Sequence, residues 1–125
     1  MISASIKNEY YQKVVRSIDH AMTVDEPLSL GGKNTGFSPL DLLAASLASC
    51  VAITLKMYAE RKQWQIDEIR VEVDLVELAI KKTIYISSNL DEGQLQRLSA
   101  ISESCPISKM LSQTNRIETL IVNRK

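Results

Sequence analysis

Apolar and polar residues alternate in three short stretches near the N-terminus, which predicts three short strands. The stretches are residues 2–6, residues 10–18, which are rich in aromatic and β-branched side chains, and residues 20–24. Pro27 cannot donate to a strand ladder and ends the third strand, and residues 30–36 form a glycine-rich loop. The first third of the chain is therefore expected to be a three-stranded meander.

A long helix is predicted to follow, over residues 40–63. Ser38 and Pro39 suit the N-cap and the first helical position, and Asp41 falls in the first turn, where its charge suits the helix dipole. For about four turns the helix is apolar or small on all sides, so we expect other parts of the protein to surround it. Its uncharged stretch, residues 42–55, has 14 residues. Because about 20 are needed to cross a bilayer, burial in protein is expected and membrane insertion is not.

The second half of the chain is predicted to continue with two strands and then two helices. Residues 69–75 alternate without a fault, and residues 80–86 form the next strand after a turn that lacks glycine. The later elements are a helix that opens at Asp91 and ends near Cys105, a short helix from Pro106, and a strand at residues 117–122. The order βββ-α-ββ-αα-β predicts one α+β domain over residues 1–125, with the long helix packed against antiparallel sheet.

Composition and charge exclude several classes of protein. The 125 residues carry 15 Lys and Arg against 15 Asp and Glu, so no net field steers the chain toward nucleic acid or anionic membranes. A hydrophobic content of 45% argues against disorder. Residues 1–11 lack the apolar stretch and cleavage site of a secretory signal, so a cytoplasmic location is expected. Cysteines there are reduced thiols unless their chemistry is redox chemistry.

Familiar catalytic and metal-binding motifs are absent from the sequence. There is no C-x-x-C or H-E-x-x-H pattern, and His20 is the single histidine, interpreted as structural or at the surface. Lys33 follows a glycine as in a phosphate-binding loop, but Pro27 and Asn34 stand where that motif requires Gly and Ser or Thr. No metal and no organic cofactor is therefore expected.

Cys50 and Cys105 remain as candidates for chemistry. Free cysteines are often simply small buried hydrophobes, and that bland interpretation applies to both. Cys50 lies inside the helix expected to be buried, where desolvation makes a thiol inert unless a cation is close. Cys105 precedes Pro106 and can cap the short helix, whose N-terminal end favours a thiolate. Local electrostatics alone thus indicates that Cys105 is the more reactive thiol.

Two segments together resemble the OsmC/Ohr family, the osmotically inducible and organic hydroperoxide resistance proteins. Residues 36–50 read GFSPLDLLAASLASC, with Gly31-Gly32 before them, and residues 104–107 read SCPI. The family pairs an [SN]-P-x-[ED]-L-L helix start with a cysteine eleven residues after the proline, and places a second cysteine in a C-P-[VI] turn. Cys50 stands eleven residues after Pro39, and both halves occur in that order.

The resemblance implies a thiol-dependent peroxidase that works as an intertwined homodimer. In that scheme Cys50 attacks the peroxide oxygen of an organic hydroperoxide and becomes a sulfenic acid, and Cys105 condenses with it to a disulfide. A cellular dithiol then regenerates the pair. Following the family we assign attack to Cys50 and resolution to Cys105, and the reverse assignment stays open.

The sequence departs from the best-studied branch of the family near the helix start. That branch supports the attacking thiolate with an Arg from the N-terminal strands, which is held by a Glu directly after the proline. Leu40 occupies this position here, and the acid lies one residue later, at Asp41. Arg16 is the candidate cation and Lys13 its substitute, although each also suits a solvated strand position. The displaced acid favours an alternative, a non-catalytic OsmC-like dimer that binds a small hydrophobic ligand.

Overall fold

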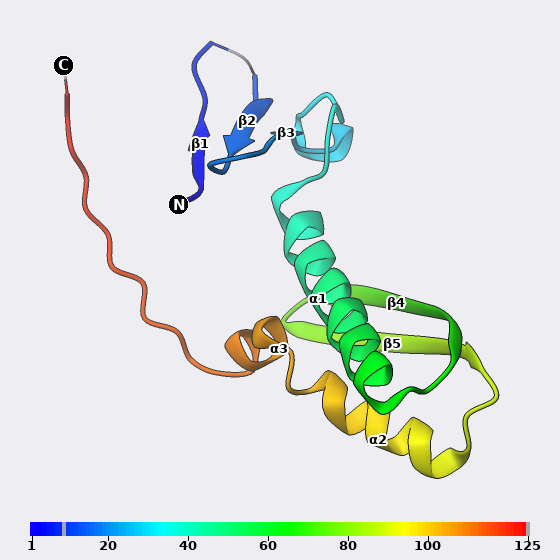
Figure 1. The fold of residues 1–125 in the computed structure, drawn as a ribbon. Helices are drawn as coiled ribbons and strands as arrows, with labels where there is room; N and C mark the ends of the chain where they lie inside the picture. The colour runs from blue at the N-terminus through cyan, green and yellow to red at the C-terminus, as the bar shows by residue number, and fades with distance from the viewer. Residues whose placement is uncertain (9, 125) are drawn as a thin grey trace. The chain divides into compact units, whose positions relative to one another are not determined.

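The computed structural model describes residues 1–8 and 10–124, and its contacts divide the chain into two compact units. The first unit comprises Met1–Ser46 with Val73–Lys82, and the second comprises Leu47–Glu72 with Thr83–Lys125. The elements, labelled in Figure 1, form an α+β fold with two sheets and one long helix. The predicted class and the order of the first eight regular elements are confirmed.

The N-terminal strands form the expected meander. Strands β1 (Ser3–Ser5), β2 (Lys13–Arg16) and β3 (Ala21–Val24) pair antiparallel in the order β1-β2-β3. Strand β2 is shorter than the predicted residues 10–18. It ends at Arg16 because the Ser17 N–H donates to the His20 carbonyl at 2.8 Å and closes a tight turn.

The loop after β3 is organised by a buried carboxylate. Asp25 is 1% exposed and accepts hydrogen bonds from the backbone N–H groups of Glu26, Lys33 and Thr35 and, at 2.6 Å, from the Thr35 hydroxyl. A short 3-10 helix, Leu28–Leu30, lies inside this loop. Glycine is required at position 32, since a Cβ there would collide with the Glu26 carbonyl.

Helix α1 (Pro39–Lys62) begins and ends at clear local signals. The Ser38 hydroxyl accepts the Asp41 N–H at 3.1 Å, which makes Ser38 the predicted N-cap. At the other end Gln63 adopts a left-handed φ of 60°, and the Trp64 N–H donates to the Ala59 carbonyl at 2.9 Å. This reversal turns the chain from the helix toward the next strand.

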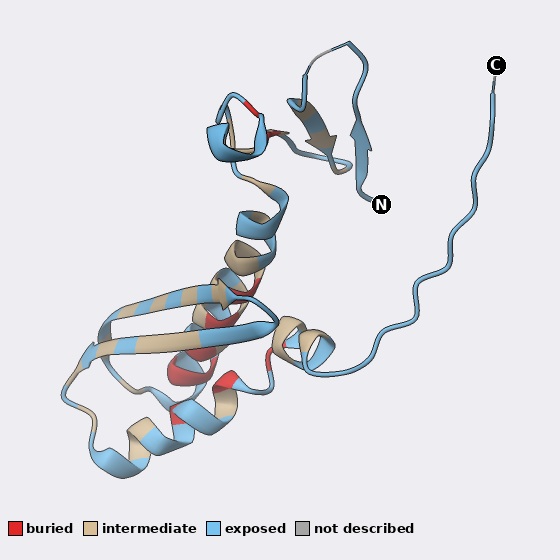
Figure 2. Cartoon of the chain, turned by 180° about the vertical axis from the view of Figure 1, so that it is seen from behind, coloured by how far each residue is buried: buried red, intermediate tan, exposed pale blue. Residues whose placement is uncertain are grey.

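Only one face of α1 is buried within the chain, although its residues are apolar on all sides. Figure 2 shows the buried face in red, formed by Leu47, Val51, Leu55, Tyr58 and Ala59. Ile53 and Met57 are each 59% exposed, so the expectation that this chain surrounds the helix is wrong. By length and hydropathy α1 also passes a test for membrane spans, as core helices of soluble proteins do. Because its uncharged stretch is short, we assign the bare face to contacts with protein or ligand.

Strands β4 (Ile66–Val76) and β5 (Ala79–Ser88) form a two-stranded sheet. Half-buried and exposed residues alternate from Ile69 to Val76, as the sequence predicts for a strand with one wet face. The connection relies on Glu77, whose φ of 55° supplies the turn in place of glycine. In Figures 1 and 2 the C-terminal part of α1 lies along one face of the hairpin.

Helix α2 (Glu92–Ser102) starts at Asp91, whose carboxylate accepts the Gln94 N–H at 2.8 Å in a full capping box. Helix α3 (Pro106–Leu111) starts at Cys105 as predicted, with Pro106 in the first turn. Leu98 of α2 is 2% exposed and completes the core beneath α1.

The predicted strand at residues 117–122 is wrong for this chain. Residues 114–124 form neither helix nor strand, and Ile117, Leu120 and Ile121 are each more than 85% exposed. Alternation gives a segment two faces, but a strand also needs a neighbour that accepts and donates backbone hydrogen bonds. Along the described residues no strand is paired with this segment.

Candidate functional site

The two cysteines, 55 positions apart in the sequence, meet in the second unit. Cys50 lies on α1 and Cys105 is the N-cap of α3, and the two side chains are hydrogen-bonded to each other as free thiols. Such a contact places the sulfurs where a modest movement can join them in a disulfide. The structure therefore brings together the two residues that the sequence singled out for redox chemistry.

The sulfur of Cys105 sits in a buried cradle of donors. Cys105 is 0% exposed, and its sulfur accepts the Ser108 N–H at 3.2 Å, while the Ser108 hydroxyl lies 3.3 Å from the Ser102 carbonyl. Burial opposes ionisation, but the hydrogen bonds from Cys50, Ser108 and the Ile107 backbone outweigh it and lower the pKa of the Cys105 thiol. Cys105 is thus the sulfur on which negative charge is favoured.

Cys50 has the opposite balance. Burial raises the pKa of the Cys50 thiol, and so does its hydrogen bond to Cys105, whereas contacts with the Ile107 backbone and the Thr54 hydroxyl lower it to a smaller extent. Cys50 is nevertheless half-buried, while Cys105 is fully enclosed. The more accessible sulfur is therefore the one that ionises less readily.

The other predicted site residues lie in the first unit. Arg16 is an exposed residue of β2 and lines a groove of about 210 Å³ together with His20 and Met22. Lys13 begins the same strand. Asp41 is exposed in the first turn of α1, where its backbone N–H is used by the Ser38 cap. The groups that act on the two sulfurs, in contrast, all belong to the second unit.

Two contributors to the site were not identified from the sequence. Thr54 lies one helical turn after Cys50, and Ser108 lies three residues after Cys105. Both positions follow from local geometry, because i and i+4 share a helix face and a cap bonds the third helical N–H. Once the cysteines are placed on helices, these spacings could have indicated both partners.

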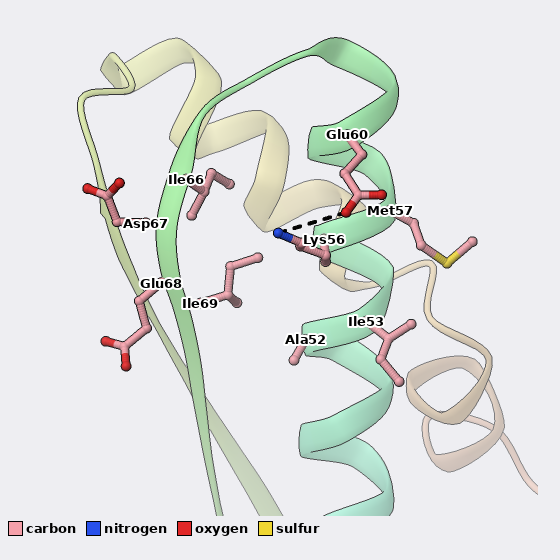
Figure 3. Close-up of a pocket in the computed structure, with 9 residues that line it drawn as sticks. All are labelled: Ala52, Ile53, Lys56, Met57, Glu60, Ile66, Asp67, Glu68 and Ile69. Carbon is pink, nitrogen blue, oxygen red and sulfur yellow. Dashed lines mark ion pairs between the residues drawn. The ribbon is translucent and has the colours of Figure 1, made fainter.

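A separate groove of about 420 Å³ opens between α1 and β4 (Figure 3). Its walls include Ile53, Met57, Ile66 and Ile69, and the Lys56 Nζ lies 3.8 Å from the Glu60 Oε1 at its rim. Neither cysteine lines it. Among residues 1–8 and 10–124 no group of three or more His, Cys, Asp or Glu side chains is arranged to hold a metal ion.

Solved structures of low sequence identity share this fold. A protein of Psychrobacter arcticus 273-4 is 23% identical, with 87% of this chain and 85% of that chain covered and a TM-score of 0.77. The OsmC-like protein of Mycoplasma pneumoniae is 22% identical over 90% and 86% of the two chains, with a TM-score of 0.75. The organic hydroperoxide resistance protein OhrB of Bacillus subtilis is 25% identical over 88% and 87%, with a TM-score of 0.57.

The family comparison covers most of the chain. No curated protein matches the sequence. The family described as OsmC-like protein matches residues 32–120, a span that contains the Ser38 cap, helix α1 and both sulfurs. The chain therefore belongs to the OsmC-like protein family.

Proposed function

We propose that this protein is a thiol-dependent peroxidase that reduces organic hydroperoxides. The observation that carries the proposal is the hydrogen-bonded pair of free thiols, one half-buried and one fully enclosed. Family membership supports a role in peroxide defence, since its relative in Bacillus subtilis is named an organic hydroperoxide resistance protein. We further propose a cytoplasmic location, where a cellular dithiol can return the pair to the reduced state.

The proposed chemistry needs only the two sulfurs. The Cys50 thiolate attacks the peroxide oxygen, the O–O bond breaks, and an alkoxide leaves as Cys50 becomes a sulfenic acid. Cys105 then attacks the oxidised sulfur, hydroxide leaves, and a disulfide forms. Cys50 is placed first because its sulfur is the more accessible, and Cys105 second because it is in contact with Cys50.

The test is stoichiometric oxidation with a simple alkyl hydroperoxide. Free thiols are titrated before and after one equivalent of cumene hydroperoxide, and the protein is then mapped by non-reducing peptide mass spectrometry. We expect both thiols to disappear and one peptide pair to link Cys50 with Cys105. Survival of both thiols would reject the proposal.

Variants of each cysteine assign the roles. Cys50→Ser is expected to abolish peroxide consumption, whereas Cys105→Ser should still consume one equivalent and stop at a sulfenic acid on Cys50, which dimedone captures. Ser49→Ala, a change at the neighbouring exposed position of α1, serves as the matched control and should behave as the native protein. If Cys105→Ser prevents the first oxidation and Cys50→Ser does not, the roles are reversed.

We also propose that the protein is a homodimer, because α1 carries a bare apolar face. Leu40, Ile53 and Met57 are between 59% and 65% exposed in the single chain, and apolar surface of this kind is normally covered by a partner. Sedimentation at micromolar concentration should give twice the chain mass of 14.0 kDa. Ile53→Lys should shift the mass toward the monomer, and a native protein that sediments as a monomer would reject the dimer.

The groove between α1 and β4 supports a second candidate function, the binding of a small hydrophobic ligand. Its apolar wall formed by Ile53, Ile66 and Ile69 favours this function, although charged side chains rim it. The fluorescent probe anilinonaphthalene sulfonate should bind, and Ile53→Trp, which fills the groove, should weaken binding, while the exposed Ile18→Trp should not. The ligand-binding function would be preferred if the probe bound in this way and both thiols survived peroxide.

A further inference from the structure

The thiol pair contains a mismatch that the two-step scheme does not explain. Cys105, the sulfur on which charge is favoured, is 0% exposed, so a peroxide cannot reach it. Cys50, the sulfur that a peroxide can reach, is the donor of the hydrogen bond that joins the two. A reactive Cys50 thiolate therefore requires its proton to be moved.

Resting on the proposed function, we propose that Cys105 is the proton carrier of the reaction as well as its resolving thiol. Cys105 accepts the Cys50 proton before the attack on peroxide and returns it to the leaving alkoxide. The hydrogen bond between the two sulfurs supplies the path for this proton. The Ser108 N–H, 3.2 Å from the Cys105 sulfur, holds that sulfur in place as an acceptor.

The sequence of steps balances in atoms and charge. The proton of Cys50 moves to the Cys105 thiolate, which leaves Cys50 as the anion. This anion displaces alkoxide from the hydroperoxide and becomes a sulfenic acid, and the Cys105 thiol protonates the alkoxide to an alcohol. Cys105 is then a thiolate again and displaces hydroxide from the sulfenic acid to form the disulfide. Proton return thus prepares Cys105 for its second role.

The first test needs no peroxide and follows thiolate absorbance at 240 nm against pH. The native protein should ionise in two steps, one below and one above the ordinary thiol value of about 8.5. Cys50→Ser, which keeps a donor for Cys105, should retain the lower step, and Cys105→Ser should leave the single thiol of Cys50 at or above the ordinary value. If the thiol of Cys105→Ser ionised at the native lower step, Cys50 would ionise unaided and the proposal would be overturned.

The second test is a single turnover with cumene hydroperoxide, in which dimedone traps the sulfenic acid. If Cys105 only resolves, Cys105→Ser should form the sulfenic acid at the native rate and then stall. If Cys105 carries the proton, formation itself should slow by about tenfold at pH 7 for each unit by which the Cys50 pKa rises, and the rate should recover at high pH. A native rate with an unchanged pH profile would overturn the proposal.

Controls separate this inference from the proposed function and from misfolding. Serine is a preferred N-cap, so Cys105→Ser should keep α3, which far-ultraviolet circular dichroism can verify. Ser104→Ala, at the exposed neighbour of Cys105, should leave the titration and the single-turnover rate unchanged. If the native protein forms no sulfenic acid at all, the peroxidase function fails, whereas the 240 nm titration still tests the shared proton.

Discussion

The Nε of Arg97 lies 3.0 Å from the hydroxyl oxygen of Tyr58, so a single hydrogen bond joins α2 to α1 across 39 positions of sequence. The Tyr58 ring also packs edge-on against Trp64, with their centroids 5.6 Å apart. Arg61 and Lys62 carry positive charge within 6 Å of the same ring. This cluster ties the end of α1 to the helix that precedes Cys105.

The cationic surroundings should be visible in the titration of this tyrosine. The hydrogen bond from Arg97 lowers the pKa of the Tyr58 phenol, and nearby charges act in the same direction. We expect one phenolate to appear, at 295 nm, below the ordinary value of about 10. Tyr58→Phe should remove this early step, and Arg97→Met should move it upward. Tyr85→Phe, at a residue that is 51% exposed, should leave the early step intact.

The core beneath α1 should be sensitive to truncation. Leu55 is 0% exposed, and Leu55→Ala should cost about 2–5 kcal/mol of unfolding free energy because it leaves a cavity. Ile121, which is 88% exposed, provides the control, since Ile121→Ala should change stability by less than about 0.5 kcal/mol. Urea unfolding followed by circular dichroism measures both. Equal losses would show that the C-terminal segment is buried in solution.

The carboxylate of Asp25 should make stability depend on pH in the acid range. Hydrogen bonds from Thr35 are the largest cause that lowers the pKa of Asp25, with backbone donors adding to it against the effect of burial. A lowered native pKa means that the contribution is complete above about pH 4 and is lost as pH falls through the native value. Asp25→Asn should lower Tm by a few degrees at pH 7 and flatten the acid limb. A Tm unchanged by this substitution at pH 7 would contradict the proposed role of the loop carboxylate.

Arg16 tests whether a cation from the N-terminal strands serves the peroxidase. If its guanidinium stabilises the Cys50 thiolate, Arg16→Gln should slow peroxide consumption about tenfold for each unit of pKa lost. Lys13→Gln removes the same charge from the same strand and should have a smaller effect. Equal rates for Arg16→Gln and the native protein would remove Arg16 from the site.

Local signals in the sequence predicted where helices begin, because a cap depends on residues only three positions apart. Ser38, Asp91 and Cys105 each accept a backbone N–H at the predicted helix start. The start of β4 was missed, since Asp67 and Glu68 are both exposed and interrupt the alternation that resumes at Ile69. Periodicity detects a strand only where its two faces differ regularly.

Features that depend on distant or additional partners could not be obtained from periodicity. The contact between Cys50 and Cys105 spans 55 positions, so the resemblance to a family and not the spacing suggested it. The same reasoning predicted a strand at residues 117–122 because the pattern is suitable, but a pattern supplies no pairing partner. Likewise the apolar faces of α1 indicate that something covers them without indicating what.

The sulfur of Cys105 has a further duty, since it is the acceptor that starts α3 through the Ser108 N–H. A disulfide sulfur accepts hydrogen bonds more weakly than a thiolate, so oxidation of the pair would loosen the first turn of this six-residue helix. Amide proton exchange at Ser108 should then quicken in the oxidised protein. The backbone that leads into the C-terminal segment would in this way register the redox history of the thiols.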